Sequence, residues 1–118
     1  GLENRLTGDV LLRTDSEIGI IVGFENHSAR TYLGQTARPL GFIEHGFGNN
    51  GTDMTEGTIY KNAIGTYLHG PILPRNEQLT LFLLKKALRN YSVDLGKVDM
   101  IQEPASADAF LYAKKILM

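Results

Sequence analysis

The sequence predicts an α/β fold in which a β-rich first half is followed by two helices. Short runs of β-branched and apolar residues, separated by glycine-rich or polar turns, occupy the part of the chain before Pro71. Apolar residues at helical spacing follow Pro74. An apolar share of 42% in 118 residues is enough to fill a packed core. We therefore expect residues 1–118 to form one small domain or a part of a larger one.

Five strands are expected in the first half. The second of them contains a continuous β-branched core, which indicates burial on both faces. In chain order the expected strands are Thr7–Arg13, Glu17–Phe24, Leu40–Gly46, Gly57–Lys61 and Ala63–Leu68. The polar stretch Glu25–Pro39 has little periodicity and is expected to be a loop. The glycines and asparagines of Gly46–Gly51 predict a sharp turn.

Two helices are expected in the second half. Asn76 is placed to cap the first, which is predicted over Glu77–Asn90. Its apolar positions recur at helical spacing: Leu79, Leu83, Leu84, Ala87 and Leu88. The second is predicted from about Ser106 to Leu117, with one apolar stripe. Strands that precede helices without alternating β-α-β units are typical of a piece of a larger α/β domain.

The composition excludes several classes of protein. Twelve basic and thirteen acidic residues leave a net charge of −1, so there is no electrostatic reason to expect nucleic acid or an anionic membrane as partner. No apolar run approaches the roughly 20 residues of a membrane helix. The first residues contain no apolar signal core, so a cytoplasmic protein without membrane insertion is expected. The chain has no cysteine, which excludes disulfides, thiolate metal sites and a cysteine nucleophile within it.

Three histidines are the candidates for chemistry. His69 is expected at the C-terminal end of the Ala63–Leu68 strand, and ligands of open α/β sheets bind outside the carboxyl ends of strands. A histidine there can act as general acid or base near neutral pH, although a lone histidine is more often structural. His27 also follows an apolar strand and could meet His69 in one crevice; a loop histidine held by polar neighbours is an equal alternative. His45, beside the glycine turn, is expected at the surface.

Other kinds of site find little support in the sequence. The three histidines could supply three zinc ligands, but their spacing matches no ligand motif, so no metal is expected. The amides of the Gly46–Gly51 loop could bind an anion. Because the loop lacks the lysine and spacing of a phosphate-binding loop, a tight turn is the favoured interpretation. No serine lies in a nucleophile elbow, so the chain offers a base without a nucleophile.

Three segments carry a resemblance to a known family. They are Gly23–Leu33 (GFENHSARTYL), Gly46–Gly51 (GFGNNG) and Glu56–Pro74 (EGTIYKNAIGTYLHGPILP). In this order they resemble the cobyric-acid-synthase type of class I glutamine amidotransferases, over a stretch from about Glu3 to about Ala87. Within this type the likeness is closest to the glutaminase subunits of lipid II isoglutaminyl synthases, which act in peptidoglycan synthesis.

The resemblance implies a mechanism and a partner. A cysteine thiolate attacks the side-chain amide of glutamine, and a histidine transfers protons. The ammonia passes to a Mur-ligase-like, ATP-dependent subunit that amidates the D-glutamate of lipid II; no cofactor of the glutaminase is implied. The family histidine matches His69. Glu25, Asn26 and His27 match a stretch near the active site and are expected to bind substrate. Pro71 stands where many class I enzymes have the acid that orients the histidine.

The resemblance also implies that the chain is the C-terminal portion of an amidotransferase domain. The family's nucleophile belongs to the preceding half, which nothing here matches, so this chain is expected to be inactive alone. A half-sheet exposes apolar faces and strand edges, so homo-oligomers are expected. Two alternatives stay open: the amidotransferase part of cobyric acid synthase, in cobalamin biosynthesis, and a non-catalytic module that binds a partner.

Overall fold

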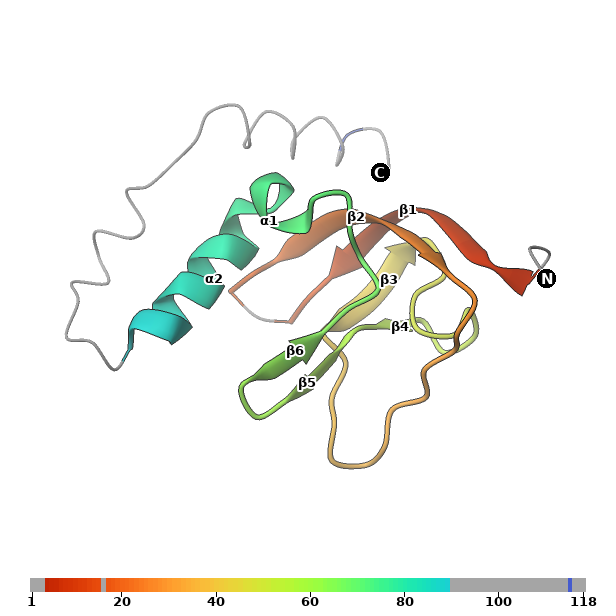
Figure 1. The fold of residues 1–118 in the computed structure, drawn as a ribbon, viewed down its shortest axis with the longest axis horizontal. Helices are drawn as coiled ribbons and strands as arrows, with labels where there is room; N and C mark the ends of the chain where they lie inside the picture. The colour runs from red at the N-terminus through yellow and green to blue at the C-terminus, as the bar shows by residue number, and fades with distance from the viewer. Residues whose placement is uncertain (1–3, 16, 90–114, 116–118) are drawn as a thin grey trace.

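The computed structural model describes residues 4–15, 17–89 and 115 of the chain. Strands fill the part up to Gly65 and helices follow, so the predicted α/β fold with a β-rich first half is confirmed (Figure 1). The helix predicted from Ser106 to Leu117 lies outside the described residues, apart from Lys115. Among the residues that are described, no helix is both long enough and apolar enough to cross a membrane.

The strands form one sheet and one separate hairpin. They are β1 (Leu6–Arg13), β2 (Ile20–His27), β3 (Gly41–His45), β4 (Thr55–Glu56), β5 (Thr58–Tyr60) and β6 (Ala63–Gly65). The sheet has the order β2-β1-β3-β4, and β5 pairs with β6. All of these pairs are antiparallel. β2 is therefore an outer strand of the sheet, with one edge left for other partners.

β2 begins and ends later than the sequence predicts. Both the amide and the hydroxyl of Thr14 donate to the carbonyl of Gly19, at 2.9 and 2.7 Å, and so close a hairpin loop before β2 begins. At its other end the pairing with β1 continues until His27 lies opposite Leu6. The prediction of a loop from Glu25 onward is thus wrong for Glu25–His27. A polar composition does not prevent pairing where a neighbouring strand supplies the ladder bonds.

The core gathers side chains from the sheet, the loops and α2. Its buried members are Val10, Leu12, Ile18, Ile21, Leu40, Ile43, Leu68 and Leu79. Successive side chains of a strand point to opposite faces. Glu25 and His27 therefore share with Ile21 the face of β2 that looks toward this core, whereas Phe24 and Asn26 point to the opposite side.

Two helices, α1 (Ile72–Arg75) and α2 (Glu77–Leu88), follow the strands. α1 contacts β2, and Figure 1 shows α2 continuing from α1. The single turn of α1 was not predicted; Pro71 precedes it in an extended conformation. α2 begins at Glu77, as predicted. The predicted cap is wrong, because the Asn76 side chain makes no capping hydrogen bond and is bound to β2 instead.

Candidate functional site

The main chain of His69 lies against the free edge of β2. Its amide donates to the carbonyl of Phe24 at 3.0 Å, and its carbonyl accepts from the amide of Phe24 at 3.1 Å. Because β2 is an outer strand, these groups of Phe24 have no strand partner within the sheet. The two bonds fix the backbone of His69 relative to the sheet.

The segment before His69 differs from the strand that the sequence predicts. β6 ends at Gly65, and the next amides turn to side chains: that of Tyr67 donates to Glu56 Oε1 at 2.8 Å, and that of Leu68 donates to the hydroxyl of Thr66 at 3.0 Å. The prediction that His69 lies at a strand end is therefore wrong. Its position is set by the edge of β2, and not by the carboxyl end of a parallel strand.

Two glycines shape the backbone at this contact. A Cβ atom on Gly23 would lie 3.2 Å from Cβ of Leu68 and 3.5 Å from the carbonyl oxygen of His69, so a side chain there would press on the segment. Gly70 has a φ of +101°, a conformation that L-residues with side chains rarely adopt. It turns the chain immediately after His69.

The imidazole of His69 is exposed, and its polar atoms are available. Its ring meets that of Phe24 edge-on, with centroids 5.4 Å apart and planes at 75°. Within the part of the chain that the structure describes, no hydrogen bond or ion pair reaches this imidazole. An edge contact restrains the ring without occupying either nitrogen. The side chain is thus free to exchange protons with a group brought to it.

A buried asparagine attaches the next segment to the same strand. Asn76 is 1% exposed. Its side chain accepts from the amide of Val22 and donates to the carbonyl of Val22, both at 2.8 Å, and it donates to the carbonyl of Ile72 at 2.7 Å. The side-chain amide therefore replaces a strand partner at Val22. Together, Asn76 and His69 bind the free edge of β2 at Val22 and Phe24, two residues apart.

We expect Asn76→Ala to lower the free energy of unfolding by about 2–4 kcal/mol, because three backbone groups lose their partners, two of them in buried hydrogen bonds. Urea denaturation measures the loss. Asn26→Ala is the matched control, since Asn26 is exposed and its side chain is bound at the surface by Arg5 and Thr7. A loss below about 1 kcal/mol is expected there. Equal losses for the two variants would contradict the role assigned to Asn76.

Glu25 is a buried carboxylate surrounded by donors. It is 0% exposed, its Oε1 accepts from the amide of Phe47 at 2.6 Å, and its Oε2 accepts from the amide of Gly48 at 3.0 Å. Oε2 also lies 3.0 Å from Nε2 of His27, whose Nδ1 lies 2.9 Å from the carbonyl of Ala29. Both ring nitrogens of His27 thus lie within hydrogen-bond distance of an oxygen atom. The amides of the Gly46–Gly51 loop bind a carboxyl group of the protein itself, that of Glu25.

The ring of His27 also connects Glu25 to the segment that precedes His69. It stacks on Tyr67 with centroids 3.7 Å apart and planes at 3°. The hydroxyl of Tyr67 lies 2.7 Å from that of Thr31. Its amide is bound by Glu56, which is also 0% exposed and accepts from the hydroxyl of Thr66. Burial raises the pKa of Glu56, and the hydrogen bonds from Tyr67 and Thr66 act in the opposite direction. We call Glu25, His27, Glu56 and Tyr67 the buried polar network.

The predicted site residues do not all lie together. Glu25 and His27 are hydrogen-bonded to each other on the core-facing side of β2, and Asn26 points to the other side. The ring of His69 meets Phe24, which also points to that other side. His27 and His69 therefore lie on opposite faces of β2 and do not share a crevice.

The third candidate histidine, His45, is exposed at the end of β3. In the described ranges, no group of three or more His, Cys, Asp or Glu side chains is placed to hold a metal ion.

The sequence did not point to Glu56 or Tyr67, and it indicated Asn76 only as a helix cap. Their buried partners are distant in the chain, and Asn76 is separated from Val22 by 54 residues. Such pairs leave no signal in the local pattern on which sequence interpretation depends.

The sequence of this chain is similar to a known protein family and to characterised relatives. The model of the CobB/CobQ-like glutamine amidotransferase domain matches residues 2–77. The chain is 45% identical, over 98% of its length, to subunit GatD of the glutamine-hydrolyzing lipid II isoglutaminyl synthase of Staphylococcus aureus. It is 42% identical, over 89% of its length, to the subunit of the same name in Streptococcus pneumoniae. It spans 44% of the first relative's length and 38% of the second's.

Proposed function

Because this chain belongs to the CobB/CobQ-like glutamine amidotransferase family, we propose that it is the histidine-bearing part of a glutamine-hydrolysing subunit. The observation that carries the proposal is the similarity, over 98% of the chain, to a subunit of lipid II isoglutaminyl synthase. In this proposal the parent subunit supplies ammonia for the amidation of D-glutamate in lipid II, and His69 is its catalytic histidine.

The proposed reaction needs a thiolate that this chain does not contain. A cysteine elsewhere in the parent attacks the amide carbon of glutamine and forms a tetrahedral intermediate. His69 takes the proton of the cysteine thiol and then gives it to the leaving nitrogen, so that the C–N bond breaks, ammonia leaves and a thioester remains. His69 then takes a proton from the water that hydrolyses the thioester to glutamate. A fixed backbone and an exposed imidazole support this role for His69.

The three neighbouring residues receive different roles. We assign Glu25 and His27 to the support of the site, since both are buried and their polar atoms are bound within the protein. Asn26 is exposed and stays the candidate for contact with substrate. Through Tyr67, the buried polar network joins the strand that carries these residues to the segment that carries His69.

The proposal includes a second subunit. The relatives are named as subunits of a synthase, so they act together with another chain. Ammonia can amidate a carboxylate only after that carboxylate has been activated. We therefore propose an ATP-dependent, Mur-ligase-like subunit as the partner.

A glutaminase assay tests the proposal. The full-length parent is expected to release ammonia from glutamine, and the isolated 118-residue chain is expected to release none, because it contains no cysteine. Coupling ammonia release to glutamate dehydrogenase measures both. Release by the pure chain, or no release by the parent even with its ligase subunit, would contradict the proposal.

The final substrate is tested separately. Amidation of lipid II by the parent and its ligase subunit is expected, and amidation of a corrin carboxylate would instead support the cobyric acid synthase alternative. A parent protein without any cysteine would favour the non-catalytic module.

A further inference from the structure

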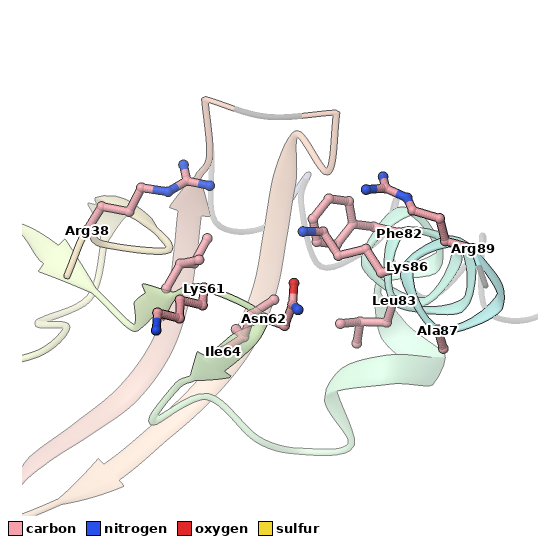
Figure 2. Close-up of a pocket in the computed structure, with 10 residues that line it drawn as sticks. Arg38, Lys61, Asn62, Ile64, Phe82, Leu83, Lys86, Ala87 and Arg89 are labelled. Atoms are coloured by element: carbon pink, nitrogen blue, oxygen red, sulfur yellow. The ribbon is translucent and has the colours of Figure 1, made fainter. Parts of the chain in front are cut away.

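A cleft of about 460 Å³ lies between the β5–β6 hairpin and α2 (Figure 2). None of the described residues that line it belongs to the His69 contact or to the buried polar network. Part of its lining is apolar and comes from Ile59, Ile64, Phe82, Leu83 and Ala87. The polar part contains Asn62 and four cationic side chains, which are Arg38, Lys61, Lys86 and Arg89.

The charged side chains among the described residues that line this cleft are all cationic. None of these described lining residues is acidic, although the whole chain has a net charge of −1. None of the described carboxylates forms an ion pair with any of the four cations. Lys61 and Lys86 instead lie 5.3 and 5.0 Å from the ring centres of Tyr60 and Phe82. Positive charges gathered without a countercharge favour the binding of an anionic group.

The arrangement of the cations fits an extended partner better than a small anion. Figure 2 shows the charged ends of Arg38, Lys86 and Arg89 spread across the cleft, with Lys61 directed away from them. A small anion is held by groups that converge on it. An acidic protein segment with one apolar side would match both parts of the lining: its apolar side would cover Ile64, Leu83 and their neighbours, and its carboxylates would face the cations.

We propose that this cleft binds an acidic, amphipathic segment of the partner subunit. The inference rests on the proposed function, which supplies the partner. Association between unlike charges on two proteins is fast at low salt and slows as ions screen the attraction. Binding of the ligase subunit should therefore depend on ionic strength through the association rate, and the cleft should carry that dependence.

Charge reversal in the full-length parent tests the inference. The double variant Lys86→Glu with Arg89→Glu is titrated against the purified ligase subunit by biolayer interferometry, at low and at high salt. We expect binding at low salt to weaken by about tenfold or more, mainly through slower association, and the salt dependence to decrease. The matched control, Lys86→Arg with Arg89→Lys, keeps both charges and is expected to bind as the wild type does.

Unchanged binding by the charge-reversed variant would overturn the inference, and so would an equal loss in the charge-conserving control.

Hydrogen exchange tests whether the ligase subunit is what occupies the cleft. Exchange at residues 61–64 and 82–89 should become slower than in the free parent when the ligase subunit is added, and no further slowing would also overturn the inference, because the hydrogen bonds of α2 and β6 already protect part of these amides. Glutamine hydrolysis by the parent is measured in parallel. If the parent hydrolyses no glutamine, the proposed function is contradicted. If the parent hydrolyses glutamine but its binding to the ligase subunit does not depend on the cleft, only this inference is contradicted.

Discussion

In the full-length parent, His69→Ala is expected to lower kcat for glutamine hydrolysis by about 10⁴-fold or more, because the attacking thiol loses its proton-transfer partner. The leaving nitrogen must be protonated, and bulk water does not replace an imidazole held at the reacting atoms. KM should change much less than kcat, since the role proposed for His69 is proton transfer and not the binding of glutamine. Steady-state kinetics with glutamine measures both constants.

The loss should come without a comparable loss of stability. His69 is bound to Phe24 through backbone groups that alanine keeps, and its exposed ring adds only an edge contact. The free energy of unfolding should therefore fall by less than about 1.5 kcal/mol. His45→Ala is the matched control, because His45 is an exposed histidine at the end of β3. A His69→Ala protein that keeps most of its activity, or a His45→Ala protein that loses as much, would contradict the assignment.

The elements that depend on a local pattern could be predicted from the sequence. α2 begins at Glu77, where apolar residues start to recur at helical spacing. The limits of β2 could not be predicted, because they depend on the register of its pairing with β1. The position of His69 could not be predicted from the local pattern either. The number of residues between β6 and His69 does not predict its position, because two backbone hydrogen bonds to Phe24 hold it against β2.

The candidate site likewise has one part that the sequence predicts and another that it does not. The residues around His69 were enough to name a family and a candidate base, but not the groups that hold them. An asparagine before a helical pattern is usually a cap, and Asn76 occupies that position while its side chain binds Val22. The turn over Gly46–Gly51 was expected from its glycines. Its use as the binding site for Glu25 depends on a contact that no local pattern contains.

Glu25→Gln is expected to lower the free energy of unfolding by about 3–5 kcal/mol, because several buried hydrogen bonds are disturbed at once and each buried group left without a partner costs about 1–3 kcal/mol. Glutamine has nearly the same size, so the loss reports on hydrogen bonding and charge rather than on packing. The amides of Phe47 and Gly48 and Nε2 of His27 all point at the two carboxylate oxygens. The NH₂ group of the new glutamine would face a donor in whichever of the two oxygen positions it occupied. That buried donor would lose its acceptor. Urea denaturation at neutral pH measures the loss.

Glu56→Gln is the matched control for Glu25→Gln, because Glu56 is equally buried but accepts from one amide and one hydroxyl. The hydroxyl of Thr66 can turn to accept from the new NH₂ group. Burial raises the pKa of Glu56, so the folded state favours the neutral form of this carboxyl group more than the unfolded chain does. The contribution of this preference to the free energy of unfolding is fully present below the ordinary pKa of glutamate. It is lost as pH rises through the raised pKa of Glu56 in the folded state. Glu56→Gln should therefore be nearly neutral for stability at neutral pH and should weaken the pH dependence over that interval. Similar losses for the two variants would mean that burial alone decides the effect, and would contradict the importance given to the donors around Glu25.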